Sequence, residues 1–164
     1  MHTVSFLVEN QPGVLFNVSN LFRRRGFNIE SITVGALEDP RYSRMTITVD
    51  ADPKTLNNLL DQLDKMVEVI RVKRLDPLRT VRREMLLVKL GTSDPMARED
   101  ALKYINVQHG LVLDIDEDHI VAEVSGEPEE LDQFIGYVKS IGIVEMSRSG
   151  VTALEKGRLT LKVK

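Results

Sequence analysis

Residues that could perform chemistry are few in this chain and are widely spaced. The three histidines, His2, His109 and His119, stand at the N-terminus and in two predicted turns, and no H-x-x-x-H spacing aims two imidazole rings at one metal ion. The run from Asp114 to Asp118 has the spacing of the first ligands of an EF-hand calcium loop. His119, however, stands where that loop needs glycine, and Ser125 stands where it needs glutamate. These residues predict surface histidines and a polar hairpin turn rather than a metal site.

Other catalytic classes lack the residues that they require. The sequence has no cysteine, which excludes disulfides, thiolate nucleophiles and cysteine-ligated metals. It also lacks the glycine patterns of phosphate-binding loops, of dinucleotide-binding turns and of the G-x-S-x-G nucleophile elbow. We therefore predict no catalytic residue, no metal and no cofactor in this chain.

The composition narrows the choice of partners. The chain of 164 residues has a formal net charge of -3 and a pI near 5.7, and 5% of its residues are aromatic, with no tryptophan. The absence of a basic surplus and of stacking residues disfavours nucleic-acid binding. No apolar run approaches the roughly 18 residues that span a bilayer, and the N-terminus does not read as a secretion signal. We expect a cytoplasmic protein that binds neither nucleic acid nor membrane.

One short segment has the features of a small-ligand site. In Asn10-Gln11-Pro12-Gly13-Val14-Leu15 a predicted strand passes into a predicted helix, with glycine at the helix start. Glycine lets a ligand approach the backbone, and the free amides of a first helical turn favour a carboxylate. Asn10 and Asn28 flank the same helix, and their amides can bind both an ammonium group and a carboxylate. The two asparagines could share one end of the sheet or one edge, and a plain turn and cap is an equally good interpretation.

The elements that position this segment follow the order β-α-β-β-α-β twice. In the first half, strands are predicted at 3–9, 28–36, 45–49 and 67–75, with helical stripes from Val14 to Arg25 and from Pro53 to Leu63. The cluster Arg23–Arg25, followed by Gly26, reads as a helix C-terminus, although it could also form a patch for an anion or a partner.

The second half repeats the order with strands at 85–90, 111–115, 120–124 and 141–146 and helices after Asp94 and Glu127. We predict an α+β protein of two tandem ferredoxin-like βαββαβ sandwiches, with domains at residues 1–76 and 83–164 and a linker at 77–82. The tail after Ser147 is less periodic, and its last residues, 158–164, could add an edge strand or fray.

The motifs of this sequence resemble those of one known family. Three stretches, 8–15, 21–31 and 43–47, closely resemble the small regulatory subunits of acetolactate synthase (acetohydroxyacid synthase), and the resemblance continues through 63–69, 83–89 and 148–150. It covers nearly the whole chain. The motif N-x-P-G-V-L alone would indicate only the wider ACT-domain superfamily.

The resemblance implies an N-terminal ACT domain that forms a homodimer and binds a branched-chain amino acid, typically valine, at the dimer interface. It implies feedback inhibition in valine, leucine and isoleucine biosynthesis. The chain itself would be non-catalytic and would activate a separate large subunit, which carries thiamine diphosphate, Mg²⁺ and FAD and condenses pyruvate to acetolactate. The exposed sheet face of the first domain and the Arg23–Arg25 end are candidate contacts for that subunit.

The resemblance also assigns residues to the effector site. The family's effector contacts correspond to Asn10, Gly13 and Asn28, while neighbouring residues would line the pocket: Gln11, Pro12, Val14, Leu15 and Ile29. Two alternatives stay open, a freestanding amino-acid sensor without an enzyme partner and a small enzyme of the acylphosphatase kind.

Overall fold

The chain folds into two units, seen in a computed structural model that describes residues 1–163. The first unit contains residues 1–81 together with the segment that begins at Val151, and the second contains residues 82–150. No helix in this described range is long and apolar enough to cross a membrane.

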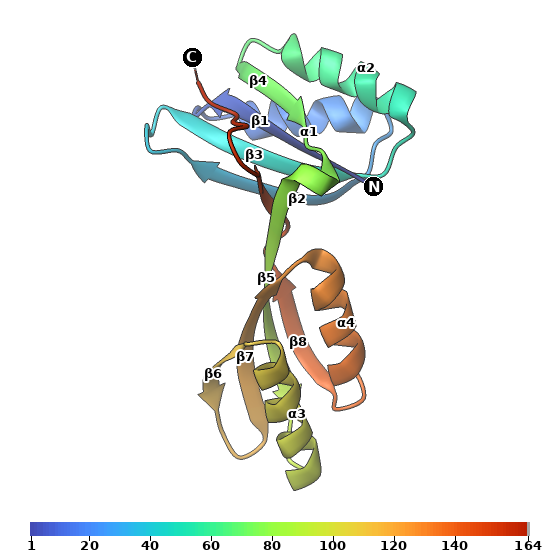
Figure 1. Cartoon of the computed structure of the whole chain (residues 1–164), viewed down its shortest axis with the longest axis vertical. Helices are drawn as coiled ribbons and strands as arrows, with labels where there is room; N and C mark the ends of the chain where they lie inside the picture. Colours follow the sequence, from blue (N-terminus) through green and yellow to red (C-terminus); the bar gives the residue numbers. More distant parts are fainter. Residues whose placement is uncertain (164) are drawn as a thin grey trace. The chain divides into compact units, whose positions relative to one another are not determined.

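The first unit is a four-stranded antiparallel sheet with two helices on one face (Figure 1). The strands follow the spatial order β2-β3-β1-β4. Its elements are β1 (His2–Glu9), α1 (Val14–Arg24), β2 (Ile29–Ala36), β3 (Tyr42–Val49), α2 (Pro53–Asp64) and β4 (Val69–Arg74). The predicted βαββαβ order of this half is therefore confirmed.

Helix α1 forms because its apolar residues fall on one stripe that the sheet can bury. The predicted stripe is buried in full and consists of Val14, Val18, Leu21 and Phe22. The helix ends as predicted, with Arg23 and Arg24 in the last turn and Gly26 at a φ of 71° beyond it. The cluster of arginines is thus explained by the helix terminus.

Helix α2 begins at a side-chain cap. Asp52 accepts hydrogen bonds from the amides of Lys54 and Thr55, and Pro53 occupies the first helical position, where it costs no hydrogen bond. Its buried face, Leu56, Leu59 and Leu63, completes the core over β1 and β3.

The second unit has the same architecture. Its sheet order is β6-β7-β5-β8, and α3 and α4 lie together on one face (Figure 1). The elements are β5 (Thr80–Gly91), α3 (Pro95–Val107), β6 (Leu111–Ile115), β7 (His119–Gly126), α4 (Pro128–Val138) and β8 (Ile143–Arg148). An ion pair with a buried carboxylate joins β5 to β8. Arg148 donates to both carboxylate oxygens of Glu84 at 3.0 and 2.6 Å, and this pairing raises the pKa of Arg148.

The boundary between the units differs from the predicted one. The expected linker at 77–82 is a short 3₁₀ turn, Pro77–Arg79, followed directly by β5, and the division falls inside that strand, after Val81. The predicted second domain, 83–164, includes the tail, but residues from Val151 onward belong to the first unit. A strand also forms in the tail, at β9 (Thr152–Glu155) rather than at 158–164; residues 158–163 have no regular structure, and Lys164 lies outside the described residues.

Hydrogen bonds and an ion pair hold this tail against the face of the first sheet that carries no helix. Val151 donates its amide to Ser31 Oγ at 3.3 Å and accepts from Thr33 Oγ1 at 2.9 Å. Arg44 Nη2 donates to the carbonyl of Ala153 at 2.9 Å, and Lys73 Nζ contacts Glu155 Oε2 at 2.6 Å. The Glu155 side chain is only 5% exposed, so this ion pair is largely removed from solvent on its acidic side.

The tail makes the predicted open sheet face a buried one. Four side chains near the middle of β1 and β3 that point away from the helices are buried: Ser5, Leu7, Thr46 and Thr48. Burial also lowers the pKa of Arg44. The Nε atom of this side chain is buried and has no hydrogen-bond partner. The expectation that this face is exposed is therefore wrong for its middle, while the contact with a large subunit stays a prediction.

We predict that Glu155 anchors the tail. Replacing it in Glu155→Gln removes the charge that pairs with Lys73 and should cost about 1–2 kcal/mol of unfolding free energy. Hydrogen exchange of residues 151–155 should accelerate at the same time.

The matched control is Glu145→Gln, whose Lys89 partner lies 3.8 Å away with both side chains exposed. That change should cost less than about 0.5 kcal/mol. Equal effects of the two substitutions would contradict the anchoring role.

Candidate functional site

The loop between β1 and α1 presents an uncapped helix start. Gly13 occupies the N-cap position at a φ of 88°, in the left-handed region that glycine adopts without strain, and no side chain caps the helix. The Val14 amide reaches the carbonyl of Gln11 at 3.4 Å. The amides of Leu15 and Phe16 precede the first residue that can find a helical acceptor, so they are available to an anion.

The residues of this loop divide into exposed and buried ones. Asn10, Gln11, Pro12, Gly13 and Leu15 are exposed. Val14 is not, because its side chain belongs to the hydrophobic core of the unit. Of the predicted lining residues of the loop, Val14 therefore offers only its backbone to a ligand.

The β2–β3 hairpin orients Asn10. The Asn10 amide nitrogen Nδ2 donates to the carbonyl of Pro40 at 2.9 Å, and its backbone N–H donates to Arg41 at 2.7 Å. The hairpin is itself stiffened by Arg41, which bonds the Asp39 carboxylate at 2.6 Å and lowers the pKa of that group. Sequence reasoning missed this contribution, because an Asp-Pro turn by itself reads only as a connection between strands.

Asn28 is oriented in a similar way at the start of β2. It is exposed, and its Nδ2 donates to Glu30 Oε1 at 2.7 Å, while the adjacent Ile29 packs partly against the core. In both asparagines one N–H of the amide is engaged, which leaves the amide oxygen and the second N–H free. Each therefore presents an acceptor suited to an ammonium group.

The structure does not bring Asn10 and Asn28 together. In the sheet register Ile29 lies in the row of Val49 and His2, whereas Asn10 follows Glu9, which pairs with Tyr42 at the opposite end. Eight residues of extended strand separate the two rows, which is roughly 25 Å at ~3.3 Å per residue. The suggestion that one end of the sheet holds both asparagines is wrong for a single chain.

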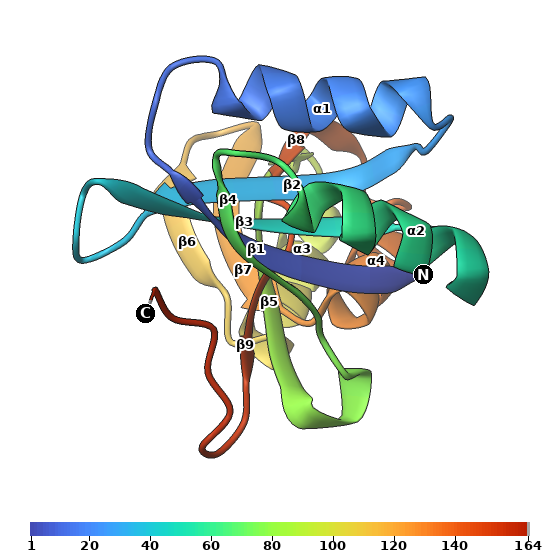
Figure 2. The same cartoon turned by 90° about the horizontal axis from the view of Figure 1, so that it is seen from above.

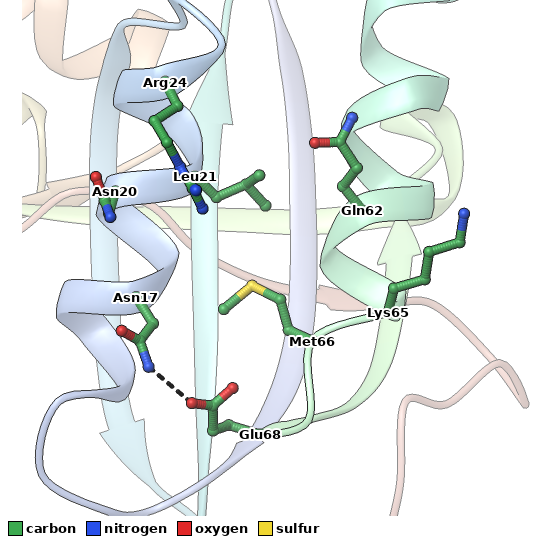
Figure 3. Close-up of a pocket in the computed structure, with 8 residues that line it drawn as sticks. All are labelled: Asn17, Asn20, Leu21, Arg24, Gln62, Lys65, Met66 and Glu68. Carbon is green, nitrogen blue, oxygen red and sulfur yellow. Dashed lines mark hydrogen bonds between the residues drawn. The ribbon is translucent and has the colours of Figure 1, made fainter.

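A pocket in the same unit lies elsewhere, between α1 and α2 (Figure 3). It has a volume of about 350 Å³, and none of the predicted site residues lines it. Asn17 Nδ2 crosses it to Glu68 Oε1 at 2.7 Å, while Arg24 and Lys65 stand along its rim and Leu21 and Met66 lie within it. The Asn17–Glu68 bond ties the first turn of α1 to the segment that precedes β4.

The other polar candidates from the sequence have structural roles. Asp116 Oδ1 accepts from the amides of Asp118 and His119, both at 2.7 Å, and these bonds lower the pKa of Asp116. The acidic run is therefore a hairpin turn, as predicted. Among residues 1–163, no group of three or more histidine, cysteine, aspartate or glutamate side chains is placed to hold a metal ion.

Comparison with known families covers both units of the chain. The AHAS small subunit-like ACT domain matches residues 4–71, and the family described as the small subunit of acetolactate synthase matches residues 83–157.

Individual relatives match along nearly their whole length. The chain is 41% identical over 160 residues to a probable acetolactate synthase small subunit of Methanothermobacter thermautotrophicus, covering 98% of this chain and 95% of that protein. It is 37% identical to the acetolactate synthase isozyme 3 small subunit of Escherichia coli, covering 94% of each. A crystal structure of the acetolactate synthase small subunit from Thermotoga maritima superposes with a TM-score of 0.88 at 36% identity, covering 96% of this chain and 98% of that one. The chain belongs to the family of acetolactate synthase small subunits, with an ACT domain as its first unit.

Proposed function

We propose that this chain senses valine at a site shared by two copies of its ACT domain and passes the signal to a catalytic large subunit of acetolactate synthase. The observation that carries the proposal is the separation of Asn10 from Asn28. Each end of β2 holds half of an amino-acid site, and a second copy can supply the other half. Family membership supports the choice of a branched-chain effector, because that enzyme serves branched-chain amino-acid biosynthesis.

The free edge of the first sheet supports pairing through β2. The sheet ends in β2 on one side and β4 on the other. Strand β4 carries Arg71, Lys73 and Arg74, which would repel one another in a symmetric pair, whereas β2 carries only Glu30. Figure 2 shows α1 running along the β2 margin, where Leu15, Phe16 and Val34 are exposed apolar residues. A second copy would cover them.

Antiparallel pairing of two β2 strands completes the site. A two-fold axis through the edge places the start of one β2 beside the end of the other. Ala36, at the end of β2, lies in the row of Ser43 and Val8, next to the Asn10 loop. Asn28 of one copy therefore approaches the Asn10–Leu15 loop of the other.

The free groups match the polarity of an amino acid. The amides at the start of α1 would bind the carboxylate, and the Asn10 and Asn28 oxygens would accept from the ammonium group. The exposed side chains Leu15 and Val34 would contact the isopropyl group. Symmetry then predicts two valine molecules per dimer.

In this proposal the chain regulates the enzyme by binding to its large subunit. The large subunit would hold thiamine diphosphate, Mg²⁺ and FAD and convert pyruvate to acetolactate in the cytoplasm, and the small subunit would raise its activity and make it valine-sensitive. Valine must bind two assembly states unequally, since an effector shifts an equilibrium only by its differential affinity.

Reconstitution tests this function. Mixing the purified chain with the large subunit should increase acetolactate formation, and valine should reverse the increase. Calorimetry should give one valine per chain. Valine binding without any effect on the large subunit would instead identify a freestanding sensor, and acyl-phosphate hydrolysis by the chain alone would identify an enzyme.

Gly13→Asp should abolish valine binding. A Cβ at Gly13 meets no atom within 4 Å, so no clash opposes the substitution, although the φ of 88° strains any side chain there. The new carboxylate places an anion where the ligand carboxylate goes. We expect the valine Kd to rise at least about tenfold, or about 1.4 kcal/mol. Activation of the large subunit should persist.

The control is Gly13→Asn, which has the shape of aspartate without its charge and tolerates the same left-handed backbone. Its valine affinity should fall less than that of Gly13→Asp. Undiminished valine binding by Gly13→Asp would refute this placement of the carboxylate.

Val34→Lys should separate the copies and remove valine binding together. A lysine on an edge strand opposes pairing with another strand, whereas Val67→Lys introduces the same charge at an exposed position outside the strands. Light scattering should show a lower mass for Val34→Lys alone. A Val34→Lys monomer that still bound valine with full affinity would show that the site lies within one chain.

A further inference from the structure

Strand β6 is an exposed aliphatic edge in the second unit. It reads Leu111-Val112-Leu113-Asp114-Ile115, and all five residues are exposed, the four aliphatic ones by 41 to 59%. The strand pairs with β7 on one side and ends the sheet. A terminal strand offers unpaired backbone groups on its outer side, and proteins usually protect such an edge with charges. Here only Asp114 is charged.

The opposite edge of the same sheet is protected. Strand β8 carries Glu145, which pairs with Lys89, and Arg148, which pairs with Glu84 and Asp132. The two edges of the second unit therefore differ as β4 and β2 differ in the first. One is charged and the other is nearly uncharged.

Strand β6 also has the topological position of β2. Each is the second strand of its βαββαβ unit and occupies the same end of the strand order, β2-β3-β1-β4 against β6-β7-β5-β8. The equivalent edge is thus left open twice in one chain. The exposure of β6 is observed independently of the effector proposal.

We propose that β6 is a second self-association surface, which pairs antiparallel with β6 of another copy about a two-fold axis at Leu113. In this register Leu111 faces Ile115 of the other copy, and Leu113 faces its own counterpart. Leu113 is the extra residue of a β-bulge, because the register with β7 shifts between Val112 and Asp114 and leaves it without a partner there.

The charges that flank β6 favour antiparallel pairing with a second copy of the chain. Before β6 stand Gln108, His109 and Gly110, without a carboxylate, and after it stands the acidic turn 116–118. Antiparallel pairing places each acidic turn beside the uncharged or cationic flank of the other copy. Parallel pairing would place the two acidic turns together, at a cost in repulsion. A symmetric interface needs such a self-complementary patch.

Single cysteines in the full-length chain test the register, since the chain has none of its own. Opposed residues of antiparallel strands have Cα atoms about 4.5–5.5 Å apart, within the span of a disulfide. Under mild oxidation Leu113→Cys should give a covalent dimer in most chains. Leu111→Cys should link to Ile115→Cys in a mixture but not to itself, because its counterpart lies roughly 13 Å away.

Tyr137→Cys on α4 is the collision control, because Tyr137 is 54% exposed and Leu113 is 52% exposed. Linking by Leu113→Cys well above this control supports the proposal. Linking equal to the control, or self-linking by Leu111→Cys, would overturn it.

A thiol-labelling experiment tests whether another protein covers β6. If Leu113→Cys stays free in the chain alone and becomes protected only when the large subunit is added, the large subunit covers β6 and the proposal is wrong. Neither readout involves valine. Absence of the cross-link would not contradict the proposed effector site. Absence of valine binding would likewise leave the Leu113→Cys cross-link as the expected result.

Discussion

The path of α1 is the constraint on which the proposed site depends. The helix runs back along the sheet between two parallel strands, so the chain leaves β1 at one end and enters β2 at the other. Asn10 and Asn28 are only 18 positions apart in sequence, yet they mark opposite ends of the sheet. A single ACT domain therefore cannot close its two half-sites around one ligand. If two copies complete them, effector binding and association of the copies are thermodynamically linked, and each must strengthen the other.

The tail from Val151 onward lies on the face of the first sheet that the helices leave uncovered. Helices α1 and α2 bury one face of its sheet, and the segment that begins at Val151 lies against the other, where Ser5, Leu7, Thr46 and Thr48 are buried. The cover reaches β2 through Ser31 and Thr33, close to Asn28. The segment follows β8 of the second unit directly in the chain, so the polypeptide itself connects that unit to the strand that carries half of the proposed effector site.

Charge placement distinguishes the edges of both sheets. Cations line β4 and ion pairs line β8, whereas β2 and β6 each carry a single charged residue, Glu30 and Asp114. Because like charges oppose strand pairing and aliphatic side chains favour burial, the same physical rule favours the second strand of each unit for association.

The sequence by itself determined the elements and the location of the candidate loop. Periods of two and of 3.6 residues are local, so the strands, the stripe from Val14 to Phe22 and the proline-led helix starts could be read directly. Glycine at position 26 indicated a left-handed helix end for the same reason, and its φ of 71° confirms this. Only the tertiary structure decided the distance between Asn10 and Asn28, the support of Asn10 by Pro40 and the return of the tail. The bond from Thr33 to Val151 joins residues 118 positions apart. Pairings of that range depend on how whole elements pack, which no local pattern specifies.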